Sequence, residues 1–451
     1  MGVVLRLEIR RLVRSRGLGA ALLVWVIAAA AAAVHGGAVV ERQRLALTES
    51  DRLQAEQHDA VLRHQSSAPA GDQLYYLAYH TRHVPSSWAP LSLGQRDQRA
   101  FNLKVRMLAL HGQLYDADLT SPLLAALGTF DFAFVLIALA PLVVIAVTHD
   151  VLSSEREAGT WPLIRSQPVA ALRLLGLKLG VRVGVVTLVM LVVTLLAPLT
   201  AGAALDGRLL AVALVTLLYL ALWGVLALVV ATFDRSSEVN LLALLGVWLL
   251  WVVIGPALVT TAASARYPAP EALELTVQQR EGYHGAWDRP VAETMARFYE
   301  RYPEWARAGV PSDRYSNGWY YAMQQRGDDA AAPAAERYLA TLDARHRWVQ
   351  RSWWWLPPAL VQAAFDRAAR TDLPGHLGYL ASVAGYHEQL KRHFFPIVFA
   401  EATTVRDVEW SAAPRHEYVD EGTAAPLFVA AAGVAAWCAA LGLVATRRQL
   451  G

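Results

Sequence analysis

The chain has 451 residues, of which 55% are hydrophobic and 18% are charged. This composition is too apolar for an ordinary soluble protein and too charged for one that lies wholly in lipid, so we expect a membrane part and an aqueous part. The net charge of +3 does not indicate nucleic-acid binding, and the single cysteine, Cys438, excludes an intramolecular disulfide.

Six apolar runs come close to the ~20 residues that a helix needs to cross a bilayer. They occupy roughly 18–39, 132–148, 183–205, 209–233, 241–262 and 425–446. The first run follows Arg10, Arg11, Arg14 and Arg16 and could instead be a cleaved signal peptide, although it is long for the apolar part of one. We therefore predict six transmembrane helices.

Lys and Arg residues near the span ends predict the orientation. They cluster in the N-terminal segment, in the loop after the second span and at the C-terminus: Arg6, Arg10, Arg11, Arg14, Arg16; Arg156, Arg165, Arg173, Lys178; Arg447, Arg448. With six spans these three segments share one side, so both termini are expected in the cytoplasm.

The expected divisions are 1–40 (cytoplasmic N-terminus and first span), 41–128 (first extracytoplasmic insertion), 129–262 (spans two to five, with a cytoplasmic loop at 149–178), 263–424 (second extracytoplasmic insertion) and 425–451 (sixth span and cytoplasmic C-terminus).

Both insertions are expected to be mainly helical. Residues 291–310 and 334–356 carry apolar side chains at mixed three- and four-residue spacings, and 41–65 is typical of a polar helix that continues from the first span. No run of alternating strands is present. The predicted fold class is an all-α integral membrane protein, with six transmembrane helices and a mainly helical extracytoplasmic cap built from the two insertions.

The sequence contains no motif for catalysis. A G-x-x-x-x-G-K-[ST] phosphate loop does not occur, so any ATP would be bound by a partner subunit, and we expect no cofactor in this chain. His387 and His393 are six residues apart, which turns them about 240° from each other on a helix and argues against a metal site. No G-x-S-x-G elbow is present either, which disfavours an enzyme.

The loop after the second span reads HDVLSSEREAGTWPLIRSQPV, from His149 to Val169. Together with the context of the Ser-rich turn at 233–240, it resembles the first cytoplasmic loop of ABC-2-type exporter permeases. Residues 128–145, 251–259, 266–271 and 386–399 resemble the subgroup of these permeases with two large extracytoplasmic insertions. The resemblance implies a permease in the bacterial inner membrane, surrounded by membrane lipid. It also implies a separate ABC ATPase subunit and a second permease, as a homodimer or a homologous partner.

A short helix along the membrane surface would let this loop dock in a groove of the ATPase. We expect the charged side chains to face the ATPase, whereas Leu152, Trp161, Leu163 and Ile164 face lipid or the span roots. Gly159 is expected to end the helix and Pro168 to start the next one, over 169–181. The candidate ATPase-coupling residues are Glu155, Arg156, Glu157, Gly159, Thr160, Gln167 and Pro168. The alternative is an ordinary solvated loop.

Other polar and aromatic residues have simpler interpretations. Asp131 is expected to cap the second span rather than contact substrate, and Lys178 and Arg182 to extend toward lipid phosphates. Trp353 and Trp354 suggest core or interfacial packing, although they could line a path for an apolar substrate. The predicted function is the permease subunit of an ATP-driven exporter. The alternative is a non-transporting ABC-type mechanotransmitter that acts on an extracytoplasmic partner.

Overall fold

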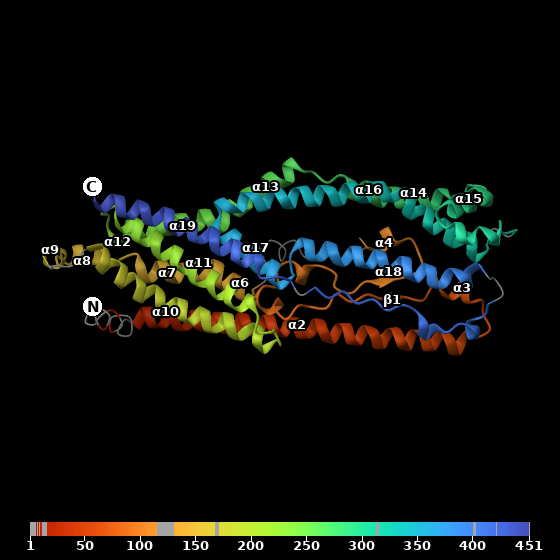
Figure 1. Cartoon of the computed structure of the whole chain (residues 1–451), viewed down its shortest axis with the longest axis horizontal. Coiled ribbons are helices and arrows are strands. Elements are labelled where there is room, and N and C mark those ends of the chain that lie inside the picture. Colours follow the sequence, from red (N-terminus) through yellow and green to blue (C-terminus); the bar gives the residue numbers. More distant parts are fainter. Residues whose placement is uncertain are drawn as a thin grey trace.

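The structure, a computed structural model, describes Arg6, Glu8, Arg10 and residues 16–114, 130–166, 171–312, 315–399, 403–420 and 422–450. Its helices run along one long axis (Figure 1). The two termini lie together with α8 (Ser153–Glu157) and α9 (Trp161–Arg165) at one end, which we call the terminal end. At the other end, the cap end, lie α3 (Ala70–Gln73) and α15 (Val291–Arg301).

The predicted all-α class is confirmed. Within the described residues the regular strands are β1 (Tyr79–His80) and β2 (Lys104–Val105), which pair antiparallel over two residues. Six segments are long and apolar enough to cross a membrane: Gly19–His64, Phe132–Glu157, Arg173–Leu199, Gly207–Ala231, Ser237–Arg266 and Ala425–Arg448. The chain is therefore a multi-pass membrane protein with a large polar cap.

The helices of the membrane part follow the predicted apolar runs closely. They are α2 (Arg16–His64), α6 (Phe132–Phe134), α7 (Ala140–Thr148), α10 (Ala171–Thr200), α11 (Gly207–Ala231), α12 (Ser237–Trp248), α13 (Gly255–Arg266) and α19 (Ala425–Leu450). Residues 171–181 are helical, as predicted, but they belong to α10, which continues into the third span, whereas 169 and 170 lie outside the described residues. No proline interrupts α10 before Pro198, so nothing breaks it at that point.

Two spans contain a π-helical turn. Val135–Leu139 (η3) joins α6 to α7, and Leu249–Ile254 (η4) joins α12 to α13. Each turn is followed at once by a proline, Pro141 or Pro256, near the start of the next helix. Because proline has no N–H group and its ring crowds the preceding turn, it disfavours the regular α-helical bonding there.

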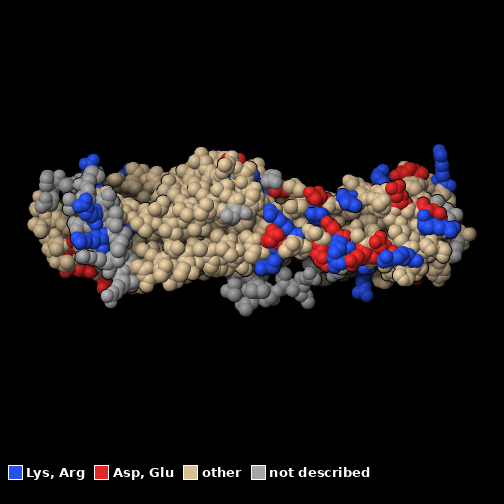
Figure 2. All heavy atoms as spheres, turned by 90° about the horizontal axis from the view of Figure 1, so that it is seen from below, with Lys and Arg blue, Asp and Glu red and all other residues tan. Residues whose placement is uncertain are grey.

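On the face seen in Figure 2, a broad band of the membrane part shows almost no charged side chains. Figure 2 shows this band between a basic cluster at the terminal end and the mixed acidic and basic surface of the cap. The core beneath it contains Phe132, Ile145, Tyr219, Trp223 and Leu427. Side chains in the band need no water, which agrees with its placement in lipid.

The two polar regions fold together around one core. The remaining elements of the first region are η1 (Ala89–Leu91), η2 (Arg96–Gln98) and α4 (Leu110–Leu114). Those of the second are α14 (Glu271–Gly285), η5 (Pro303–Ala308), α16 (Asn317–Ser352), η6 (Trp353–Trp355), α17 (Pro357–Ala369), α18 (Leu373–Phe399), η7 (Val405–Asp407) and η8 (Trp410–Ala412). Tyr79 and Met107 from the first region share a hydrophobic cluster with Phe298, Trp319 and Phe394 from the second.

Helix α2 connects the membrane part to the cap without a break. Its 49 residues correspond to about 74 Å at the usual rise, and the polar continuation predicted over 41–65 is its second half. Trp25, Ala29 and Ala32 are buried in the core of the spans, which favours a permanent span over a cleaved leader. Gly36 packs against Pro90 of η1, where α2 leaves the spans.

Part of the second insertion turns back beside the spans. The backbone carbonyl of Trp354 accepts a 2.9 Å hydrogen bond from Nε1 of Trp437, which is twelve residues, about 18 Å, along α19 from Ala425. Leu356 lies against Gly255, at the far end of α13 from the cap. The end of α16, η6 and the start of α17 thus form a hairpin packed against the spans, which we call the re-entrant hairpin because it turns back toward the terminal end. The location of 263–424 outside the membrane stays a prediction.

The close contact at Gly36 generates a stability prediction. A β-carbon at position 36 would overlap the carbonyl group of Pro90, so Gly36→Ala should destabilise the protein by about 1–3 kcal/mol through overpacking. At Gly37 no atom lies within 4 Å of such a β-carbon, so Gly37→Ala should instead stabilise the helix by up to about 1 kcal/mol. Thermal unfolding in detergent measures both effects. Equal melting temperatures for the two variants would contradict this account of the junction.

Candidate coupling site

The loop after the second span folds into two short helices around Gly159. This residue has φ of 71°, in the left-handed region that glycine adopts without strain. Its N–H donates to the carbonyl of Arg156 (2.9 Å), and the N–H of Thr160 donates to the carbonyl of Glu155 (2.9 Å). These two bonds satisfy the last carbonyl groups of α8. The prediction that the helix ends at Gly159 is confirmed.

Glu155 faces into the protein, so the prediction that it faces the ATPase is wrong. Its Oε1 lies 2.8 Å from Nζ of Lys178 on α10, and its Oε2 accepts a 2.6 Å hydrogen bond from the Thr160 hydroxyl. Glu155 and Lys178 are both buried. The acid takes this inward position because a buried ammonium group requires a counter-charge.

Lys178 and Arg182 do not extend toward lipid phosphates as predicted, because both find acidic partners inside the protein. Nε of Arg182 lies 3.0 Å from Oε2 of Glu8, and Nη1 lies 2.7 Å from Oδ1 of Asp150. Nη1 also donates to the carbonyl of Val147 (2.8 Å) at the end of α7. Since the two cations are one turn apart, α10 holds the N-terminal segment, α7 and α8 together.

The Ser-rich turn at 233–240 docks against the same loop. Arg156 forms an ion pair with Asp234, and the Glu157 carboxylate accepts hydrogen bonds from the backbone N–H (2.8 Å) and hydroxyl (2.9 Å) of Ser237. The hydroxyls of Ser153 and Ser237 are 2.8 Å apart. Glu157 thus places a negative charge at the N-terminus of α12, where the helix dipole favours it. The loop is braced on both α10 and α12.

An accessible face remains on the far side of the loop. Glu157, Gly159 and Thr160 are exposed, and the Leu163 side chain is 69% exposed. Trp161 packs against the span core, as predicted, and under the Arg156 guanidinium. That Leu163 faces lipid or the span roots stays a prediction. Gln167 and Pro168, two of the predicted coupling residues, lie outside the described residues.

Asp131 is a helix cap, as predicted, and it also connects the membrane part to the cap. Its Oδ1 accepts a 2.8 Å hydrogen bond from the N–H of Phe134 at the start of α6. Its Oδ2 accepts a 2.8 Å hydrogen bond from the N–H of Leu93 in the first insertion. The second bond was not predicted, because no local pattern relates Leu93 to Asp131.

Trp353 and Trp354 line a cavity of about 680 Å³ between α13, α16, α17 and α19. Trp353 also packs against the span core, which agrees with the predicted packing role. Since α17 and α19 are separate segments in the sequence, only the folded chain brings this cavity together. Contact of these tryptophans with a substrate stays a prediction.

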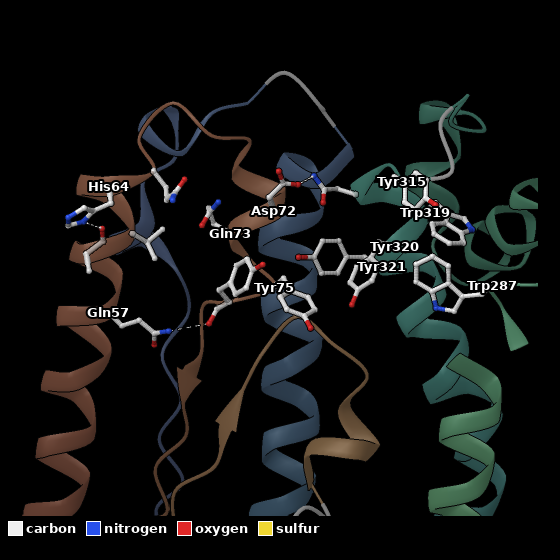
Figure 3. Close-up of a pocket in the computed structure, with 15 residues that line it drawn as sticks. Gln57, His64, Asp72, Gln73, Tyr75, Trp287, Tyr315, Trp319, Tyr320 and Tyr321 are labelled. Carbon is white, nitrogen blue, oxygen red and sulfur yellow. Dashed lines mark hydrogen bonds between the residues drawn. The ribbon is translucent and has the colours of Figure 1, made fainter. Parts of the chain in front are cut away.

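A second cavity, of about 980 Å³, opens at the cap end between the end of α2, α3 and the start of α16. Figure 3 shows aromatic rings from both insertions around it, with the Asp72 carboxylate accepting a 2.8 Å hydrogen bond from Nδ2 of Asn317. The rings of Tyr75 and Tyr320 are 5.9 Å apart. None of the lining residues is a lysine or arginine. We call this cavity the aromatic cleft, which sequence reasoning missed.

These observations define an all-α, multi-pass membrane protein whose terminal-end loops are braced on the spans and whose spans support a helical cap. Residues 3–295 match the family model described as ABC-2 family transporter protein, and residues 272–419 match a domain of unknown function, DUF3526. The chain belongs to the ABC-2 family of transporter proteins and is a membrane permease of an ABC system. Comparison with curated proteins and with solved structures finds no match.

The buried ion pair generates a second prediction. Glu155→Gln leaves Lys178 without its nearest counter-charge and should destabilise the protein by about 3 kcal/mol, as measured by thermal unfolding in detergent. Glu155→Gln combined with Lys178→Met removes both charges and should restore most of the loss.

The matched control is Arg156→Gln, because the Asp234 side chain with which Arg156 pairs is 60% exposed. Such a pair contributes about 1 kcal/mol or less. If Glu155→Gln unfolds at the wild-type temperature, or if the double variant is no more stable than the single one, the ion pair does not hold the loop as described.

Proposed function

We propose that the chain is the membrane-spanning subunit of an ATP-driven exporter and couples a separate ATPase subunit to substrate movement. The observation that carries this proposal is the braced loop at 149–166. An ion pair with Lys178 joins it to α10, and hydrogen bonds from Ser237 to Glu157 join it to α12. Its far side presents Glu157, Thr160 and Leu163 to the surroundings. A force that the ATPase exerts on this face would be transmitted directly to two spans. A freely solvated loop could not transmit such a force.

The exposed face suits a protein groove. Leu163 provides an apolar anchor at the tip of the loop, and the Glu157 carboxylate lies at the edge. Buried apolar anchors within a polar rim are typical of the centres of protein interfaces. In this proposal Glu155 and Lys178 do not touch the ATPase but hold the loop in position. Arg156 and Glu157 have two roles: they contact the ATPase, and they bind the Ser-rich turn at 233–240.

The orientation and the assembly belong to the same proposal. We propose that both termini lie in the cytoplasm, beneath a bacterial inner membrane, with the cap outside. The basic cluster at the terminal end supports this orientation. Two permeases pack together, as a homodimer or with a homologous chain. This is supported by the low burial of Ser237–Arg266, of whose most apolar window only 11% is buried within one chain. The chain itself binds neither ATP nor another cofactor.

A second candidate function is a mechanotransmitter that moves no substrate and acts on an extracytoplasmic partner. The aromatic cleft favours it, because Tyr76 and Tyr315 are exposed there with other aromatic rings beside them. Aromatic side chains are enriched at protein interfaces. In this case ATP hydrolysis would depend on the outer partner and proceed without transport.

Coupling can be tested with the wild-type chain, the ABC ATPase that co-purifies with it, and proteoliposomes. The chain alone should not hydrolyse ATP, and the complex should. Leu163→Asp should weaken ATPase binding by about tenfold or more, because it places a charge in an apolar contact. Gly159→Val should reduce stimulation of hydrolysis, because a β-branched residue is strained at positive φ, whereas Gly159→Asn should be milder.

The control for Leu163→Asp is Val419→Asp, which changes an exposed apolar residue of the cap. It should leave ATPase binding and stimulation unchanged. Wild-type binding and stimulation by Leu163→Asp would show that the loop is only a solvated connection. ATP hydrolysis by the chain after removal of every co-purifying protein would contradict the proposal as a whole.

Orientation is tested separately by labelling single cysteines in a Cys438→Ser background. A membrane-impermeant maleimide should label Ser67→Cys in intact cells, and label Ser166→Cys only after the membrane is opened. Both serines are exposed, so burial does not prevent the reaction. Labelling of Ser166→Cys from outside would reverse the orientation.

A further inference from the structure

The 680 Å³ cavity at the base of the cap has a graded polarity. On α16 its lining proceeds from Arg345 and His346 through Val349 to Trp353 beside the spans. On α17 the order along the chain is reversed: the apolar Leu360 comes first, beside the spans, and Arg367 comes later, near the cap. The two helices are antiparallel around η6, so their apolar ends coincide and their charged ends coincide.

The apolar end lies between two of the helices that are apolar enough to span a membrane. Val429 of α19 and Thr260 of α13 line the cavity, and both helices are membrane spans. The nearby Trp354 carbonyl accepts its hydrogen bond from Trp437, well along α19 from the cap. A molecule that enters between these helices therefore comes from the hydrocarbon rather than from water.

At the charged end, the Arg345 guanidinium has an N–H group without a hydrogen-bond partner among the described residues. Nη2 of Arg345 donates to the carbonyl of Tyr267 (2.5 Å), whereas its buried Nε has no hydrogen-bond partner among the described residues. Arg367 is paired with Asp372 (2.8 Å), so these two charges cancel. Asp366 lies beside them, and burial raises its pKa to about 7, so it carries less than a full negative charge near neutral pH.

More positive charge lies next to this end. A small hollow that shares Asp372 with the cavity is lined by Arg96, Arg99 and Arg370, of which Arg370 is paired with Asp420. Burial lowers the pKa of His346 in the cavity and lowers that of His376 in the hollow to about 4, so the positive charge near neutral pH does not come from these histidines. The surplus at the charged end is therefore cationic and comes from arginines.

We propose that this cavity binds one anionic membrane lipid, with its headgroup at Arg345 and its acyl chains along Trp353, Trp354 and Val429 toward the bilayer. Arginine forms charge-assisted hydrogen bonds with phosphate oxygens, and the apolar walls match a hydrocarbon chain. The volume lies within the usual range for small-molecule sites. The inference rests on the geometry of the cavity and holds whether the lipid is cargo or a resident ligand.

Another cavity, which is apolar and has a volume of about 420 Å³, adjoins the charged end of the 680 Å³ cavity and shares His346 and Leu373 with it. It extends between α16 and α18 into the cap, so it offers acyl chains another direction. Its walls include Leu377 and Ala384. The proposal places the chains toward the bilayer instead, because the headgroup then stays beside the arginines while the chains remain continuous with the hydrocarbon.

The test uses the full chain in nanodiscs with equal amounts of phosphatidylglycerol and phosphatidylcholine that carry the same acyl chains. Native mass spectrometry after release from the nanodisc counts the lipid retained. Wild type should retain one phosphatidylglycerol in preference to phosphatidylcholine. Arg345→Gln should lower that preference by about tenfold, the loss expected for one charge-assisted hydrogen bond, and Arg345→Lys should keep part of it.

Arg347→Gln is the matched control, because Arg347 is on the same helix, is 63% exposed and pairs with Asp343 on the surface. It should retain lipid as wild type does. Ala363→Trp fills the 680 Å³ cavity and should abolish lipid retention. Ala384→Trp fills the adjoining 420 Å³ cavity and should leave retention unchanged. Circular dichroism and gel filtration verify that each variant is folded.

Three results would overturn the proposal: equal retention of the two lipids by wild type, no change with Arg345→Gln, or loss of lipid with Ala384→Trp but not with Ala363→Trp. None of them bears on ATPase coupling, because these residues are at the opposite end of the spans from the loop at 149–166. Loss of ATPase coupling with intact lipid retention would likewise leave this site in place.

Discussion

Two cations on one face of α10 have to be neutralised away from water, and this requirement organises the terminal end of the protein. Lys178 and Arg182 are buried, and a buried charge without a partner costs several kcal/mol. Glu155 and Asp150 of the loop at 149–166 and Glu8 of the N-terminal segment supply the partners. The loop at 149–166 is consequently attached to the third span by charge, and the placement of its exposed face follows from that attachment.

The spans and the cap form one connected structure. Helix α2 runs from the core of the spans to the aromatic cleft, and Asp131 bonds both the start of the second span and the backbone of Leu93. The re-entrant hairpin adds a third connection, because α17 is buried among the spans while α16 extends into the cap. A displacement of the spans would therefore move the cap, which suits both an exporter and a mechanotransmitter.

Helix α16 joins two cavities, one near each of its ends. Its first residues line the aromatic cleft, and its last turns line the cavity at the base of the cap. Its 36 residues span about 54 Å. Irregular backbone beside a span is tolerated only where it is covered by protein, and the hydrogen bond from Trp437 to the Trp354 carbonyl meets part of that need in η6. Lipid occupancy at one end and partner contact at the other would act on the same helix.

The sequence by itself determined the class of the fold, the six spans, the continuation of α2 and the glycine that ends α8. These properties depend on composition, on run length and on the conformational freedom of a single residue type, all of which are local. The resemblance of the loop at 149–169 to that of ABC-2-type permeases agrees with the family model over residues 3–295.

Tertiary structure alone decided the direction of each charged side chain. Glu155 and Glu157 are two residues apart on one short helix, yet one binds Lys178 inside and the other remains exposed. It also decided the re-entrant hairpin, because the residues around Trp354 resemble an interfacial belt until α13 and α19 are placed beside them. Pairing of charges and closing of cavities depend on segments far apart in the chain, so no local pattern specifies them.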